Sequence, residues 1–382
     1  MKSVRVAIKE SIIRWAVQRS SNPAAVEKRF PNMSKWLRGQ SQPTLRQLEE
    51  FSKAVSVPLG YLFLSNPPKM DLPIPYFRTL GDEPLRQPSP DLLETVHIME
   101  RRQAWMRDYL IERGEEPLGF VRSARTTDNV EELAGKMRNT LRLSNDWANQ
   151  HPTWTAALED LRDKIEEAGV LVVVNGVVGN NTHRKLEPNE FRGFVLIDEY
   201  APLVFINGVD GKAAQMFTLA HELAHIWLGS SAAFDLRELQ PANDETEKAC
   251  NKAAAEFLIP ATEIQQIWPS VRREAEPFRA IARRFKVSEL VTARRALDLG
   301  LITKKEFLRF YRAYQEKERR KPAAKGGNFY ATQNLRLSRR FATTVVRAVK
   351  EGKLLYRDAF RLTDLHGETF DRYAENLLKG QS

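Results

Sequence analysis

The first 68 residues carry apolar side chains at helical spacing. In the segment from Thr44 to Val55, Leu48 and Phe51 fall on one face, and Gln47 stands three positions after Thr44. That spacing is typical of a capping box at the start of an amphipathic helix. Earlier positions repeat near the same period: Ile12, Ile13, Trp15, Ala16, Val26, Phe30, Trp36 and Leu37. The pattern predicts a small all-helical bundle over residues 1–68.

Residues 69–164 are predicted to form a helical connector region. The stretch 66–84 contains five prolines and is typical of an extended segment. Ser89 followed by Pro90 then opens a long amphipathic helix, for which Gly114 is the expected stop. Further helical periodicity continues to about residue 168.

The pattern changes after residue 169, where short β-branched runs are bounded by Gly, Asn, Asp and Pro. The runs at 170–176, 193–198 and 202–208 are predicted strands of a small sheet, with helices on one side of it. Helical periodicity returns over 212–228 and ends at Gly229. The fold class that this order indicates is α+β, predominantly helical.

The remaining chain is again helical. Residues 278–302 predict helix, turn and helix, and although arginines are frequent there, the apolar positions have core spacing and favour a structural support for a domain over 165–315. Residues 316–328 are rich in charge, Pro and Gly, and predict a linker. Residues 329–382 predict a basic helical C-terminal region whose role the sequence does not disclose.

Charge is unevenly distributed along this chain of net charge +10. Residues 1–65 hold 11 Lys and Arg against 4 Asp and Glu, and residues 301–382 hold 19 against 9, whereas residues 66–300 hold 29 against 36. Possible DNA contacts therefore belong to the two ends, and other chemistry belongs to the centre. The alternative is that the basic helical faces are merely solvated.

Composition favours a cytoplasmic protein without a membrane segment. The chain has no apolar run of about 18 residues, and its N-terminus lacks the features of a signal peptide. Cys250 is the single cysteine, which agrees with a reducing compartment.

Two of the six histidines stand four residues apart in "TLAHELAHIWLG", at 218–229. On a helix, His221 and His225 present both imidazoles to one point, and Glu222 projects beside that point. Two nitrogen ligands with an adjacent carboxylate form the HExxH arrangement of zinc hydrolases, so the cofactor expected here is Zn²⁺.

The third ligand is expected on the next helix, predicted over 243–260. Glu247 and Asn251 are four residues apart and share a face of that helix. Glu247 is the predicted metal ligand, and Asn251 is predicted to contact the far ring nitrogen of His221.

These motifs resemble the ImmA/IrrE family of zinc metallopeptidases. The resemblance rests on "EFRGFVLIDEYAPLVFINGVDGKAAQMFTLAHELAHIWLG" and "EKACNKAAAEFLIP", and it spans roughly residues 165–290. The resemblance implies a zincin-like domain with His221, Glu222, His225 and Glu247 in the family's functional positions. It also implies a regulatory endopeptidase that acts on a helix-turn-helix repressor or on the product of a neighbouring gene, with possible ties to stress response or toxin–antitoxin control.

Residues 8–64 resemble the helix-turn-helix domain of the Xre regulators through "KWLRGQSQPT" and the helix after it. Phe30 and Trp36 lie about one helical turn closer together than the equivalent apolar positions in that family. This spacing shortens the element that would enter the major groove. The basic residues predicted to touch phosphates are Lys28, Arg29, Lys35, Arg38 and Arg46.

A peptidase of this type needs a base and a stabiliser of the oxyanion. Glu222 is the predicted general base toward a zinc-bound water. His183 is the first prediction for the oxyanion donor, with Tyr200 and Arg192 as further possibilities.

Two function classes stay open on the sequence. One is a zinc endopeptidase that cleaves a protein partner. The other is a DNA-binding transcriptional regulator or antitoxin-like control protein whose zinc site is structural or sensory. A structural zinc site usually fills all four positions with protein ligands, so the HExxH motif with one acid favours the enzyme.

Overall fold

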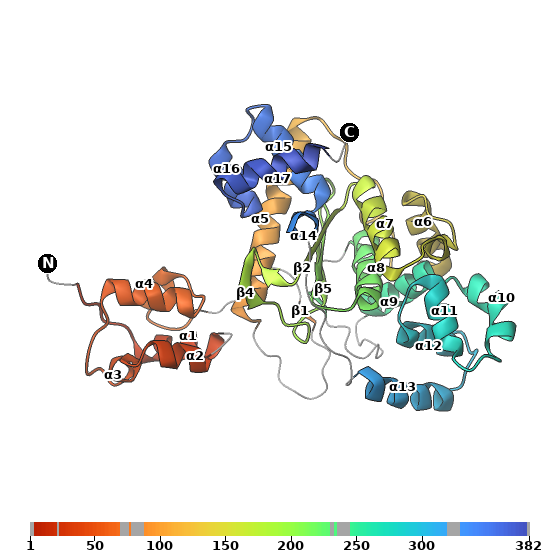
Figure 1. The fold of residues 1–382 in the computed structure, drawn as a ribbon, viewed down its shortest axis with the longest axis horizontal. Coiled ribbons are helices and arrows are strands. Elements are labelled where there is room, and N and C mark those ends of the chain that lie inside the picture. Colours follow the sequence, from red (N-terminus) through yellow and green to blue (C-terminus); the bar gives the residue numbers. More distant parts are fainter. Residues whose placement is uncertain are drawn as a thin grey trace.

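A computed structural model of the chain describes residues 4–20, 23–68, 76–77, 88–229, 233–234, 245–318 and 329–379 (Figure 1). The predicted class, α+β and predominantly helical, agrees with this structure, in which a small sheet lies among many helices. No helix in the described ranges is long and apolar enough to cross a membrane.

The N-terminal residues form a separate helical bundle with its own core. The predicted capping box is present, since the Gln47 N–H donates to Thr44 Oγ1 and the Thr44 N–H donates to Gln47 Oε1. Phe30 and Trp36 both pack against Phe51, with ring centroids 5.4 Å and 6.1 Å from it. The elements are α1 (Glu10–Arg19), α2 (Pro23–Arg29), α3 (Met33–Leu37), α4 (Leu45–Ala54) and the 3₁₀ helix η1 (Leu59–Phe63).

A five-stranded mixed sheet forms the centre of the larger part of the molecule. Its order is β1-β7-β5-β6-β2, in which β5 runs antiparallel to both β6 and β7 while β2 is parallel to β6. A separate hairpin, β3–β4, follows β2. The strands are β1 (Tyr76–Phe77), β2 (Leu171–Asn175), β3 (Val177–Val178), β4 (Asn181–Lys185), β5 (Gly193–Leu196), β6 (Leu203–Asn207) and β7 (Ala233–Phe234).

Helices cover both faces of the sheet, so the expectation of helices on one side only is wrong. Strand β6 is buried at every position, which is the pattern of a strand whose two faces are both covered. One face packs into a core with the helices α6 (Val130–Thr140), α7 (Trp154–Glu167), α8 (Lys212–Leu228), α9 (Glu245–Leu258), α10 (Ala261–Val271), α11 (Pro277–Phe285) and α12 (Glu289–Asp298).

The other face is covered by α5 and the C-terminal helices. Ser89 caps α5 (Pro90–Glu112) as predicted, through Oγ accepting from the Leu92 N–H. In Figure 1 the C-terminal helices lie beside α5, and their apolar residues share one core with α5 and the sheet. These helices are α14 (Phe329–Leu337), α15 (Arg339–Lys350), α16 (Tyr356–Thr363) and α17 (Gly367–Lys379).

Two buried charges fasten the C-terminal helices to this core. The Glu166 carboxylate accepts from the Arg339 and Arg340 N–H groups at the start of α15, where a helix favours negative charge. The Arg102 guanidinium donates to the Leu362 and Arg336 carbonyls, and burial lowers its pKa to about 10. The basic C-terminal region therefore packs as an integral layer of the larger body.

The first residues of the predicted linker at 316–328 belong to a helix. Helix α13 (Lys304–Glu318) continues to residue 318, and residues 319–328 lie outside the described ranges. Most of the proline-rich stretch at 66–84 also lies outside them.

Candidate metal centre

The three motif residues lie on α8, which is enclosed between the sheet and α9. His221, Glu222 and His225 are each 0% exposed. The helix ends as predicted at Gly229, which has φ 73° and donates its N–H to the His225 carbonyl at 2.8 Å. Because α8 is apolar nearly all round, its motif side chains are held inside the protein.

Glu247 on α9 completes a group of three donors. The Nε2 atoms of His221 and His225 are 3.1 Å apart, and they lie 3.2 Å and 3.3 Å from the two carboxylate oxygens of Glu247. Glu247 is itself 2% exposed. The structure therefore brings together the two predicted imidazole ligands and the predicted acid.

The spacing of these three donors fits a zinc ion. Tetrahedral zinc with bonds of about 2.0–2.1 Å to nitrogen and oxygen holds its ligand atoms about 3.3 Å apart. Two neutral imidazoles and one carboxylate also leave a fourth position, as catalytic zinc sites do. The donor set and its spacing support a bound metal ion.

Electrostatics in the group keep Glu247 charged and favour the neutral form of His221. Burial acts to raise the pKa of Glu247, but hydrogen bonds with His221 and His225 outweigh it and hold that pKa at about 2. Burial lowers the pKa of His221. A carboxylate and a neutral imidazole are the forms that bind a metal.

Glu222 lies beside this group in a different state. Both of its carboxylate oxygens are buried and have no hydrogen-bond partner in the described structure. Burial, and then the charge of Glu247, raise the pKa of Glu222 well above its usual range. A buried carboxyl with a raised pKa and no partner needs a reason for its presence, and proton transfer is one such reason.

Strand β5 passes directly over Glu222 at Gly193. A methyl group at Gly193 would lie 3.0 Å from Glu222 Oε1, 2.8 Å from Thr218 Cγ2 and 3.0 Å from the Phe205 carbonyl oxygen. Gly193 is not among the site residues predicted from the sequence. A signal was available, since Gly193 is the first residue of the strand predicted at 193–198, and glycine in a strand often marks a close approach.

Asn251 lies one helical turn after Glu247 on α9, which agrees with the helix predicted there. Its side chain interacts with His221, where it opposes the effect of burial by raising the pKa of the imidazole. Asn251 Oδ1 is buried and accepts no hydrogen bond within the described residues. This position is compatible with the predicted role of orienting His221, a role that remains a prediction.

The three residues predicted as oxyanion donors lie in different places. His183 is exposed on β4, and the next residue, Arg184, pairs with Asp91 on α5. Tyr200 packs against the core that contains α5, on the face of the sheet away from α8. Arg192 precedes Gly193 and pairs with Asp210 near the start of α8, at 3.5 Å. Of the three, Arg192 is next to the strand position that contacts Glu222; the donor role stays a prediction for each.

The basic residues predicted to contact DNA are all on the surface of the N-terminal bundle. Helix α3 spans five residues, which agrees with the shortened spacing seen in the sequence. Two of the five have acceptors within the bundle: Arg38 donates to the Ser34 carbonyl and Arg46 pairs with Glu50. The exposed set is Lys28, Arg29, Lys35, Arg38 and Arg46.

The helix, turn and helix over 278–302 contribute to the core beside the site. α11 and α12 are joined by Lys286 with φ 53°, and Ser288 caps α12. Ile281 and Phe285 are buried in the same core as α8 and α9. This packing agrees with the prediction, made from apolar spacing, that residues 278–302 support the domain structurally.

Comparison with protein-family models gives two matches. Residues 337–376 match a domain of unknown function (DUF8813), which spans most of α15–α17. Residues 165–297 match a peptidase family, M78, described as the IrrE N-terminal-like domain. No curated protein matches the chain. The second match contains β2, β5, β6, α8 and α9, and it supports a relation of this segment to the ImmA/IrrE family of metallopeptidases.

Proposed function

We propose that the chain is a zinc-dependent endopeptidase of regulatory type that cleaves a protein partner. The observation that carries this proposal is the buried group of His221, His225 and Glu247 inside the segment similar to a peptidase family. The neighbouring acid Glu222 adds the second requirement of peptide hydrolysis, a group that moves protons.

His221, His225 and Glu247 hold the metal in this proposal. A bound zinc ion supplies a Lewis acid that polarises a carbonyl and lowers the pKa of water to about 7. Helices α8 and α9 fix the three donors, and Asn251 orients the His221 ring. Glu222 follows His221 directly on α8, and its two carboxylate oxygens have no hydrogen-bond partner in the described structure, so they would be available to a water held at such a metal.

Glu222 acts as the general base and then as the general acid. It takes a proton from the attacking water and later delivers that proton to the leaving amine nitrogen. Its raised pKa suits the second role, because a raised pKa widens the pH range over which the carboxyl holds a proton to donate. Because Gly193 has no side chain, β5 can lie directly against the Glu222 carboxyl, and this contact restricts the orientation of the carboxyl.

The partner is expected to be a helix-turn-helix repressor or the product of a neighbouring gene, and this rests on the family resemblance. The N-terminal bundle, as an Xre-like domain, would bring that partner or its DNA site to the peptidase. It touches the larger body where Arg19 donates to the Pro88 carbonyl at 2.7 Å, just before α5.

The proposal is tested by cleavage of such a repressor with zinc-loaded wild type and Glu222→Gln, followed by intact-mass spectrometry. Wild type is expected to produce two fragments, and Glu222→Gln to cut about 10²- to 10⁴-fold more slowly with the same zinc content. Equal cutting by the two proteins would remove Glu222 from the mechanism.

A second function is favoured by the exposed basic residues of the N-terminal bundle. In this alternative the chain is a DNA-binding transcriptional regulator or antitoxin-like control protein, and the metal is structural or sensory. Two results together would favour this alternative over the enzyme. The protein would bind a DNA duplex with an affinity that falls steeply as salt rises, and it would leave partner proteins uncleaved.

A further inference from the structure

A pocket of about 440 Å³ lies on the side of α9 that faces α6 and α12. Its volume is within the range of pockets that hold small organic ligands. Phe217 from α8, Ala255 from α9 and Val291 from α12 give it an apolar lining. We call this cavity the α9 pocket.

The charged residues around the α9 pocket leave a small positive excess. Arg295 and Glu256 are buried and pair with each other, and Arg294 pairs with Asp298 at 2.9 Å, so four of the charges are balanced internally. The side chains that remain are Lys248, Lys252 and Glu131, all of them exposed. Neither lysine pairs with an acid within the part of the chain that the structure describes.

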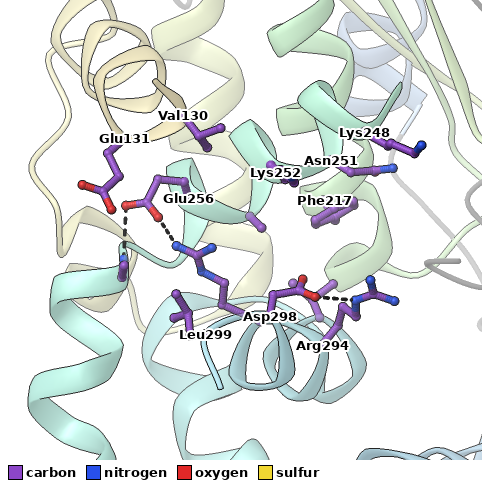
Figure 2. Close-up of a pocket in the computed structure, with 14 residues that line it drawn as sticks. Val130, Glu131, Phe217, Lys248, Asn251, Lys252, Glu256, Arg294, Asp298 and Leu299 are labelled. Atoms are coloured by element: carbon purple, nitrogen blue, oxygen red, sulfur yellow. Dashed lines mark hydrogen bonds and ion pairs between the residues drawn. The ribbon is translucent and has the colours of Figure 1, made fainter. Parts of the chain in front are cut away.

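The charges are also separated within the pocket. Figure 2 shows Lys248 and Asn251 near Phe217 toward one end, and Glu131 and Glu256 toward the other. Lys248 and Lys252 are one helical turn apart, so both ammonium groups lie along the same side of α9. An anion at this end would meet two cations without an internal partner, and its apolar part would lie against Phe217 and Ala255.

We propose that the α9 pocket binds a small organic monoanion, a single carboxylate, sulfonate or phosphodiester carried on a compact apolar body. Two lysines against one acid match one negative charge, and the lining matches an aromatic or branched aliphatic group. Nothing in this site touches the atoms that would react in peptide hydrolysis, so its ligand is an effector rather than a substrate.

The α9 pocket shares a wall with the metal centre. Asn251 lines the pocket and its side chain also interacts with His221. Phe217 precedes His221 by one turn of α8, and Lys248 follows Glu247 directly on α9. A ligand that fixes these side chains therefore changes the energy of the metal-binding arrangement, and zinc changes ligand affinity by the same factor.

The test is a fluorescence titration of the full-length protein with anilinonaphthalene sulfonate, an aromatic monoanion. One saturable site is expected in wild type. Lys248→Glu combined with Lys252→Glu reverses both charges and should weaken binding by about tenfold or more. Ala255→Trp fills the apolar part and should weaken binding without any change of charge.

Lys304→Glu combined with Lys305→Glu is the matched control, because it makes the same charge change at two exposed lysines on α13. It should change binding by less than about twofold. Equal loss in both double variants would show attraction to net charge only. Circular dichroism checks that each variant is folded. If neither Ala255→Trp nor the charge reversal at Lys248 and Lys252 changes probe binding, the probe binds elsewhere and the proposal is overturned.

The connection to the metal centre has its own readout. Zinc-loaded and metal-free wild type should bind the probe with affinities that differ by about fivefold, and Asn251→Ala should abolish that difference. Identical affinities in wild type would overturn the connection. Glu222→Gln should bind the probe like wild type, so this result is independent of whether the protein is a peptidase.

Discussion

The metal centre and the N-terminal bundle both carry residues for which the sequence predicted chemistry, and they differ in burial. His221, Glu222 and His225 are 0% exposed, whereas the basic residues of the bundle are on its surface. Removing ionisable groups from water costs free energy unless they are paired or bind a metal, while exposed lysines and arginines cost little. A buried cluster of ionisable residues is therefore evidence for a functional site, whereas an exposed basic surface needs no functional explanation.

Gly193→Ala is the substitution expected to disturb the buried region most. The added methyl would overlap Thr218 Cγ2 and press on Glu222 Oε1, so the unfolding free energy should fall by about 1–3 kcal/mol. If Glu222 is the base, cleavage should also fall while zinc is retained, because the substitution presses on the Glu222 carboxyl and does not contact His221, His225 or Glu247. Urea denaturation and zinc content measure these effects.

Gly135→Ala is the matched control, since a methyl at this helical glycine meets nothing within 4 Å. It should leave stability unchanged or raise it by about 0.5–1 kcal/mol. Equal effects of the two substitutions would mean that the close approach of β5 to Glu222 has no consequence.

If Asn251 orients the His221 ring, Asn251→Ala should weaken zinc binding by about 10- to 100-fold. Competition with a fluorescent zinc chelator measures the affinity. Lys252→Ala, next along α9 and exposed, should leave it unchanged. If Asn251→Ala binds zinc as tightly as wild type, Asn251 does not support the metal ligands and only lines the α9 pocket.

Glu222 should also set a pH dependence of stability in the metal-free protein. Its pKa is raised in the folded state, so folded protein binds more protons than unfolded protein above the usual Glu value of about 4.3. By linkage, the free energy of unfolding falls as pH rises through that window. Because the lowered pKa of His221 acts in the opposite direction near pH 6.5, the comparison is the difference between wild type and Glu222→Gln.

Urea denaturation of both metal-free proteins from pH 5 to 8 measures that difference. Glu222→Gln should gain stability over wild type as pH rises. Parallel curves would mean that the Glu222 carboxyl is not buried in the metal-free protein.

The smallest effect is expected in the N-terminal bundle. Lys28→Glu with Lys35→Glu changes two exposed side chains, so the unfolding free energy should change by less than about 0.5 kcal/mol. If the bundle contacts DNA phosphates, the salt dependence of binding should lose about two units of slope. A large loss of stability would show that these lysines support the fold.

Local signals in the sequence predicted the elements around the site closely. The stop at Gly229, the cap at Ser89 and the capping box at Thr44 all act through short-range geometry, and each is present in the structure. The covering of both sheet faces was not predicted, because residues 337–376 reach the sheet from far along the chain. Such long-range packing leaves little trace in local periodicity.

For the site, helical spacing alone predicted that His221 and His225 would converge, and the structure places Glu247 of the next helix beside them. Spacing could not predict that Gly193 would lie against Glu222, since that contact depends on how β5 crosses α8. The α9 pocket depends in the same way on three helices distant in sequence.

Metal content is the most direct test of the claim that the buried cluster is a catalytic zinc centre. Elemental mass spectrometry on protein purified without a His tag compares wild type with Glu222→Gln and Glu247→Ala. About one zinc per chain is expected in wild type and in Glu222→Gln, and much less in Glu247→Ala. Wild type that holds no zinc, even after zinc is added back, or Glu247→Ala that holds as much as wild type, would contradict it.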